Sequence, residues 1–213
     1  MNKLKKKKKL KLKLILVLIV VILFIVLGIS IYNIYNSLTS KVATEVQVLE
    51  SIENYNYNLE ENETEYYKSL FKDLKEELEK EEIDEEIYVS LITQLFISDF
   101  YSLSNSINKN DVGGVQFIYT EYQDDFIKLA KDTIYKYVEN NIYGKRTQTL
   151  PTVSEVKVTN IETDDYESEN GVIDENAYYV DVDITYLEDL GYQEVCSLII
   201  IHANNKLEIA SVE

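Results

Sequence analysis

The chain contains very little cysteine, histidine, proline or tryptophan, and the shortages exclude several classes of protein. Its 213 residues include one cysteine, one histidine, one proline and no tryptophan. With Cys196 alone no internal disulfide can form, so an exported domain must be held together by its hydrophobic core. A lipoprotein is also excluded, because Cys196 lies far from the N-terminus.

Cys196 and His202 do not combine into a reactive pair or a metal site. They lie six residues apart on one predicted strand, which separates them by about 20 Å. A zinc site needs more nitrogen and sulfur ligands than one histidine and one cysteine provide. The sequence therefore predicts no catalytic residue, no cofactor and no metal site of these kinds.

The N-terminal stretch KLKKKKKLKLKLILVLIVVILFIVLGISIYNI, residues 3–34, organises the rest of the chain. Eight lysines lie within the first thirteen residues, and no residue from Leu14 to Ile31 is charged. Eighteen helical residues span about 27 Å, which nearly matches the hydrocarbon thickness of a bilayer. We expect a cytoplasmic lysine-rich tail at 1–13 and a transmembrane helix at 14–34, with the lipid bilayer as its partner.

Charge predicts the orientation of this helix. Residues 14–213 carry 13 basic and 38 acidic side chains, a net charge of −25. Because lysines beside a span stay on the cytoplasmic side, the acidic remainder is expected to be extracytoplasmic. Lys3 to Lys13 would also hold anionic lipid headgroups. A domain with this much negative charge is not expected to bind nucleic acid.

A cleaved signal peptide is the competing interpretation, since Gly28 and Ser30 are small residues two positions apart. The apolar run is longer than a typical signal-peptide core and no A-x-A pattern follows it, which favours an uncleaved anchor. Tyr32 and Tyr35 suit an aromatic anchor at the interface. Abundant lysine, asparagine, isoleucine and tyrosine, with Arg146 as the one arginine, indicate an AT-rich bacterial genome.

Residues 35–61 are predicted to form a stalk, helical as far as Glu53, before a domain at 62–213. In that domain Asn62 and Glu65 form a capping box that opens one helix. Asp84 caps a largely apolar helix at 87–103. Its narrow polar ladder has i+4 spacing: Glu86, Ser90, Gln94, Ser98 and Ser102. A short strand is expected at 115–119, and a third helix from Thr120 to about Ile142.

After Pro151 the periodicity changes from helical to alternating. Val180, Val182, Ile184 and Tyr186 share one face of a strand, while Asp181 and Asp183 occupy the solvated face. Asn204-Asn205 indicates a tight hairpin before the last strand. The sequence therefore predicts an α+β domain with about three helices packed on a four-stranded antiparallel meander.

This order of elements, over roughly residues 84–213, resembles the cystatin-like and nuclear-transport-factor-2-like architecture. Some members of that family are bitopic, with a short cytoplasmic tail, one span and the domain outside. Assembly subunits of conjugation and type IV secretion channels follow that plan. The resemblance rests on element order, so it assigns a role to no residue.

Asp99 is the strongest candidate for a functional side chain, because apolar residues surround it in sequence. A desolvated carboxylate has a raised pKa and can serve as a general base. With Tyr101 and Tyr186 it would line a pocket between the sheet and the central helix. The preferred interpretation of Asp99 is still a structural one, in which it reaches water or a backbone donor beside the polar ladder. Asp181 with Asp183, and the acidic segment 164–176 as a divalent-cation site, are weaker candidates for which exposed surface is the preferred interpretation.

The sequence thus favours a non-enzymatic, single-span envelope protein whose extracytoplasmic domain binds an unknown envelope protein or another copy of itself. One alternative is a subunit of a conjugation or type IV secretion-like channel. The other is a small-molecule-binding or enzymatic domain built around Asp99.

Overall fold

The computed structural model describes residues 25–31, 46–168 and 170–213. The chain divides into two units, Met1–Glu45 and Val46–Glu213. Residues 25–31 are helical; the tail predicted at 1–13 and the rest of the helix predicted at 14–34 lie outside the described residues. Among the residues that are described, no helix is both long enough and apolar enough to cross a membrane.

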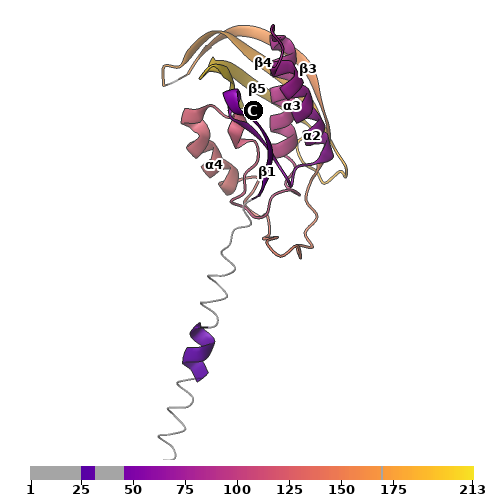
Figure 1. The fold of residues 1–213 in the computed structure, drawn as a ribbon, viewed down its shortest axis with the longest axis vertical. Coiled ribbons are helices and arrows are strands. Elements are labelled where there is room, and N and C mark those ends of the chain that lie inside the picture. Colours follow the sequence, from indigo (N-terminus) through magenta and orange to yellow (C-terminus); the bar gives the residue numbers. More distant parts are fainter. Residues whose placement is uncertain (1–24, 32–45, 169) are drawn as a thin grey trace, which may run out of the picture. The chain divides into compact units, whose positions relative to one another are not determined.

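A four-stranded antiparallel sheet is the main β element of the unit Val46–Glu213 (Figure 1). Its strands lie in chain order: β3 (Val153–Glu167), β4 (Ile173–Tyr186), β5 (Val195–Ala203) and β6 (Lys206–Val212). The predicted meander is therefore confirmed. The predicted alternation also holds, because Val180, Val182 and Ile184 are buried while Asp181 and Asp183 are exposed.

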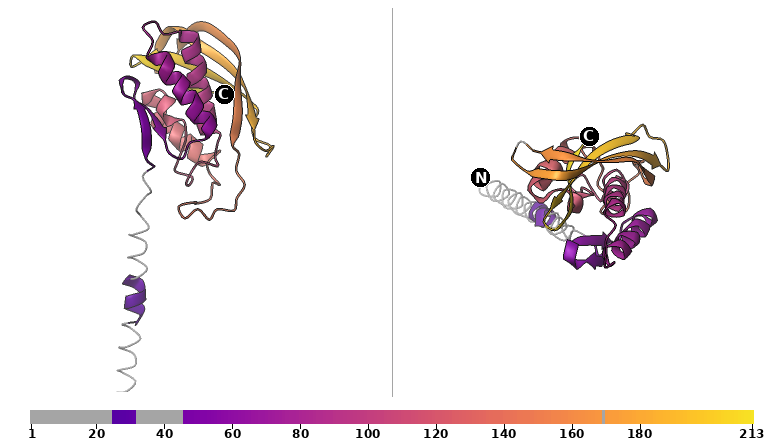
Figure 2. Two further views of the ribbon diagram at one scale, coloured as in Figure 1. Left: turned by 45° about the vertical axis from the view of Figure 1, so that its right-hand side comes forward. Right: turned by 90° about the horizontal axis from the view of Figure 1, so that it is seen from above.

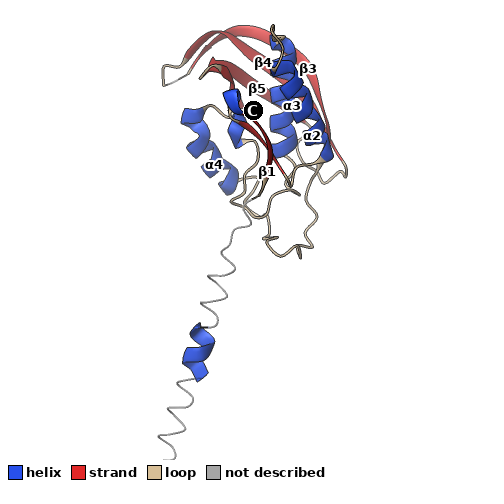
Figure 3. Ribbon diagram, viewed as in Figure 1, coloured by secondary structure: helices blue, strands red, loops and turns tan. Residues whose placement is uncertain are grey.

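The helices lie on one face of this curved sheet (Figures 2 and 3). The helical elements are α2 (Glu65–Leu78), α3 (Glu85–Phe100) and α4 (Gln123–Asp132), with short 3-10 turns η1 (Glu53–Tyr55), η2 (Val115–Phe117) and η3 (Thr120–Tyr122). Helix α3 packs against the sheet, and α2 packs on α3. The mixed α+β class is confirmed.

The two predicted helix caps have different outcomes. The carboxylate of Asp84 accepts hydrogen bonds from the backbone N–H groups of Glu86 and Ile87 at 3.1 and 3.2 Å, as predicted. For α2 the prediction was wrong, because Thr64 is the cap and its Oγ1 accepts from the Tyr67 N–H at 3.1 Å. Both Asn62 and Thr64 are capping residue types, so the sequence pattern fits either register.

The polar side of α3 satisfies the outer edge of β3. The Nε2 of Gln94 donates to the Val156 carbonyl at 3.1 Å, and the Oγ of Ser102 accepts from the Val153 N–H at 3.0 Å. The Tyr66 hydroxyl from α2 accepts from the Val156 N–H at 2.9 Å. Because β3 is the first strand of the sheet, these side chains take the place of a neighbouring strand.

The stalk predicted at 35–61 is wrong over its second half, where a hairpin forms from β1 (Val48–Ile52) and β2 (Tyr57–Glu60). Tyr57 is fully buried, and its hydroxyl bonds the Tyr88 hydroxyl at 2.8 Å and the Leu207 carbonyl at 3.0 Å. The compact unit thus begins at Val46 instead of 62. The predicted helix extended to Glu53, but residues Val48–Ile52 form β1 and only Ile52 among them is buried.

Residues 115–142 contain less regular structure than predicted. The strand expected at 115–119 is the turn η2 followed by a single parallel bridge between Ile118 and Ile209. The helix expected from Thr120 to Ile142 is the turn η3 followed by α4, which ends at Asp132. Just beyond that end Tyr135 is buried, and its hydroxyl donates to the Phe100 carbonyl at 2.7 Å.

Arg146 joins the irregular segment after α4 to the segment after α3. Its Nη1 donates to the Ser106 carbonyl at 2.7 Å, and its Nη2 donates to the Ser104 carbonyl at 2.6 Å. One guanidinium therefore fixes two irregular segments at once, which a single ammonium group does not reproduce.

We predict that Arg146→Ala lowers the free energy of unfolding by about 2 kcal/mol, because charged hydrogen bonds to partly buried carbonyls are lost. Arg146→Lys should lose about half as much. Urea denaturation measures both, with the exposed neighbour substitution Lys145→Ala as the control. Equal losses from Arg146→Ala and Lys145→Ala would contradict the assigned role.

Candidate functional site

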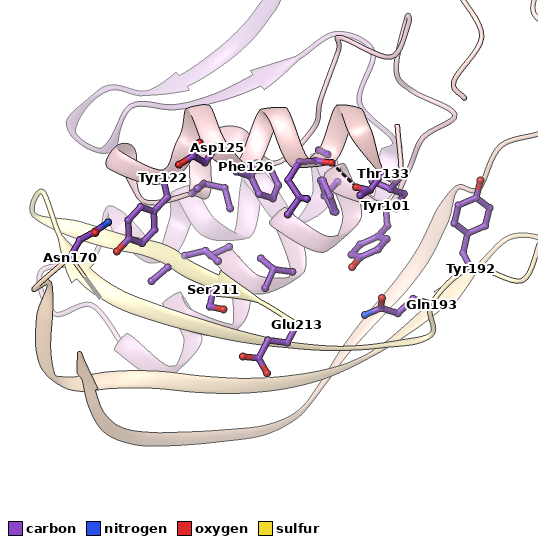
Figure 4. Close-up of a pocket in the computed structure, with 18 residues that line it drawn as sticks. Tyr101, Tyr122, Asp125, Phe126, Thr133, Asn170, Tyr192, Gln193, Ser211 and Glu213 are labelled. Carbon is purple, nitrogen blue, oxygen red and sulfur yellow. Dashed lines mark hydrogen bonds between the residues drawn. The ribbon is translucent and has the colours of Figure 1, made fainter. Parts of the chain in front are cut away.

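A groove of about 600 Å³ lies between α4 and β6 (Figure 4). Phe126, Leu129 and Ile134 line it on the α4 side, and Ile209 to Glu213 form the opposite wall. Phe100 and Tyr101, at the end of α3, also line it. Figure 4 shows Tyr122 near one end and Gln193 near the other, with Tyr101 between them.

The groove exists because α4 buries only part of its apolar surface. Phe126 packs against Phe100, with 5.1 Å between ring centroids, and Ala130 is buried. Leu129, one turn along the same helix, keeps 63% of its surface exposed. An exposed leucine that continues an apolar surface is typical of a protein-binding or ligand-binding site.

The charged side chains that line the groove are all acidic. They are Asp125 on α4 and Glu213 beside β6, and no lysine, arginine or histidine is among the lining residues. The surrounding unit 46–213 contains 12 basic and 37 acidic side chains. The groove therefore combines an apolar interior with a negative rim.

The structure separates the three residues predicted to share one pocket. Tyr101 lines the groove, and its hydroxyl lies 4.0 Å from the Cys196 sulfur. Tyr186 is not part of the lining, and its hydroxyl donates to the Gln193 carbonyl at 2.8 Å. Asp99 lies in a different pocket, because it faces the loop before η2.

That second pocket, of about 330 Å³, is acidic. Four carboxylates line it, and no basic side chain does so: Glu60, Glu63, Asp99 and Asp111. The Gly114 N–H donates to Asp99 Oδ2 at 2.6 Å. A Cβ at Gly113 would lie 2.2 Å from Asp99 Oδ1, so glycine is required for the loop to approach α3 this closely.

Burial and neighbouring carboxylates raise the pKa values of Asp99 and Glu63. Burial raises the pKa of Asp99 to about 7, the Gly114 N–H opposes the shift, and the charges of Glu60 and Asp111 add to it. Burial, followed by the charge of Asp99, raises the pKa of Glu63 still further. The pocket can therefore exchange protons near neutral pH, as the apolar sequence around Asp99 predicted.

The described residues show no cation site. No group of three or more histidine, cysteine, aspartate or glutamate side chains among them is arranged to hold a metal ion. The segment 164–176, considered as a divalent-cation loop, lies largely within the strands β3 and β4. Its side chains alternate between the two faces of the hairpin, which does not favour their convergence on one ion.

His202 has partners that the sequence did not reveal. Its Nδ1 lies 2.9 Å from Asp174 Oδ2, and its Nε2 lies 3.2 Å from Glu85 Oε1. The Tyr178 hydroxyl donates to the other oxygen of Glu85 at 3.0 Å. This cluster ties the first turn of α3 to β4 and β5. Predicting this cluster would have required the register of β4 against β5, which residue spacing does not reveal.

Comparison with known proteins gives the chain no family. No protein-family model, no curated protein and no solved structure matches it. The resemblance to cystatin-like and nuclear-transport-factor-2-like proteins stays a prediction based on the order of the elements. The groove and the acidic pocket are therefore the features from which a function can be inferred.

We predict that Asp99→Asn stabilises the unit at pH 8. A carboxyl whose pKa is raised to about 7 on folding stabilises the native state at acid pH, and that stability is lost as the pH rises from about 4 to 7. Asparagine removes the penalty and can still accept from Gly114. We expect a gain of about 1 to 2 kcal/mol at pH 8 and little gain at pH 4.

Urea denaturation at the two pH values checks this expectation. The exposed Asp183→Asn, on the outer face of the sheet, is the matched control and should leave the pH dependence unchanged. If Asp99→Asn keeps the pH dependence of the unmodified chain, the assigned pKa is wrong.

Proposed function

We propose that the chain is a single-span membrane protein whose acidic extracytoplasmic domain binds another protein through the groove between α4 and β6. The observation that carries the proposal is the apolar lining left uncovered there, with Leu129 63% exposed. A contiguous apolar surface with a polar rim is typical of a protein-binding site. Among the residues that the structure describes, no convergent set of nucleophile, base and orienting group favours an enzyme instead.

The membrane part of the proposal rests on the sequence. Residues 14–34 would span the bilayer, and the lysines from Lys3 to Lys13 would contact anionic headgroups on the cytoplasmic side. Residues 35–45 would then connect the span to the folded unit. The groove would face the envelope, where its partner would be another envelope protein.

The acidic pocket favours a second candidate function, a small-molecule-binding or enzymatic site. Asp99 there has a pKa raised to about 7, a value suited to a general base. The pocket has no basic side chain in its lining, so its ligand would be neutral or cationic. Membership of a conjugation or secretion channel stays a prediction, for which the test is whether the gene lies among transfer genes.

The anchor can be tested on the full chain in its own membrane. We expect the protein to resist extraction with alkaline carbonate and its domain to be digested by protease added to intact cells. Deleting residues 14–34 should release the protein, which serves as the control. A mature chain whose mass corresponds to cleavage after Ser30 would contradict an uncleaved anchor.

The groove can be tested with a photo-crosslinking amino acid placed at Leu129 in the anchored protein. We expect Leu129 to form a specific adduct, because it projects from the apolar wall. The control position is Leu187, which is 70% exposed but does not line the groove. Equal crosslinking from both positions, or none from Leu129, would contradict the proposed binding surface.

A further inference from the structure

We propose that the partner enters the groove as an extended segment and adds a strand to the outer edge of β6. This inference rests on the proposed function and specifies the conformation and chemistry of the bound segment. It is carried by the hydrogen-bond pattern of β6, by the path of residues 118–119 and by the charge at the rim.

The register of β6 leaves backbone groups of Val212 facing outward. The Ser197 N–H donates to the Glu213 carbonyl at 3.1 Å, and the Glu213 N–H donates to the Ser197 carbonyl at 2.9 Å. Bonded and non-bonded pairs alternate in an antiparallel ladder. Val212, opposite Leu198, is therefore a non-bonded pair whose N–H and C=O point away from β5. Within the described residues neither group has a hydrogen-bond partner.

A segment of the chain itself already pairs with the outer edge of β6 at one position. Ile118 forms a parallel bridge with Ile209, and the Tyr119 N–H donates to the Ile209 carbonyl at 2.8 Å. The chain then turns away through η3 into α4. Among the described residues, the outer edge of β6 is therefore paired at Ile209 and has no further strand partner beyond it, where the groove runs.

The free edge and the groove have matching dimensions and chemistry. Residues 209–213 line the groove consecutively. Four of them belong to β6, with a bulge between Ile209 and Ser211, and the stretch is roughly 15 Å long. In a strand added there, alternate side chains would face the apolar surface of α4 near Leu129. A lipid acyl chain could fill the same space, but it would leave the Val212 N–H without an acceptor.

The acidic residues of the groove predict which residue types the bound segment contains. Asp125 and Glu213 are the charged residues of the lining, so basic residues flanking the apolar stretch would be favoured. A second copy of this unit is disfavoured as the occupant, because each copy carries a net charge of −25 over residues 46–213 and self-association would bring like charges together. The geometry points to an apolar, alternating segment with basic flanks, supplied by another protein.

The test uses the full chain in lipid nanodiscs, since a detergent tail would compete for an apolar groove. The probe is a fluorescent peptide of alternating valine and threonine with a lysine at each end. A second peptide has the same sequence with alternate amides N-methylated, so that it cannot pair along a strand edge. Fluorescence anisotropy measures both, and we expect the methylated form to bind at least about tenfold more weakly.

Two substitutions at one position test the protein side. Val212→Pro removes the outward N–H, which a strand edge tolerates, and should weaken binding of the unmethylated peptide about five- to tenfold. Val212→Thr keeps the N–H and the branched shape, and should bind the peptide as the unmodified chain does. Circular dichroism confirms that both variants are folded.

Equal binding of the two peptides, or no binding of either, overturns strand addition. Strand addition is also overturned if free fatty acid displaces the peptide and binds both Val212 variants with equal affinity. The groove would then be a lipid-binding pocket. These results are distinct from failure of the proposed function, which is measured by crosslinking from Leu129. If a partner crosslinks at Leu129 but the peptide does not bind, the groove remains the proposed binding surface and strand addition is rejected.

Discussion

The first strand of the sheet, β3, has an outer edge that no other strand in the described part of the chain covers. The packing of the domain depends on how the backbone groups of that edge are hydrogen-bonded. Tyr66, Gln94 and Ser102 bond its backbone from α2, from α3 and from just beyond α3. Because buried backbone groups must be paired, these three side chains fix the helices in one register on the sheet. The sheet is consequently asymmetric, with β3 closed by side chains and β6 open beyond Ile209.

Features of the fold that depend on neighbouring residues could be predicted from the sequence. The alternation from Val180 to Ile184 and the turn at Asn204-Asn205, where both residues adopt positive φ, predict β4 and the last hairpin. The Asp84 cap likewise predicts the start of α3. The first hairpin could not be predicted in this way, because the burial of Tyr57 depends on Leu207, 150 residues away. The spacing of residues within the segment does not reveal that contact.

The candidate sites were likewise predictable only in part from the sequence. The raised pKa of Asp99 could be predicted from its apolar neighbours, but Glu60 could not be placed beside it, because it belongs to a segment predicted to be a stalk. The groove was missed because its two walls, α4 and β6, are far apart in the sequence. Helical periodicity also predicts a longer helix than α4, which ends at Asp132, shortly before Tyr135 bonds the Phe100 carbonyl.

The acidic pocket also changes the effective charge of the protein. The formal count treats every carboxylate as ionised, yet Glu63 and part of the Asp99 population hold their protons at neutral pH. Folding is then accompanied by proton uptake, and the native chain is less anionic than its composition implies. Acidification of its surroundings therefore makes these two carboxyls favour the folded form over the range in which they titrate.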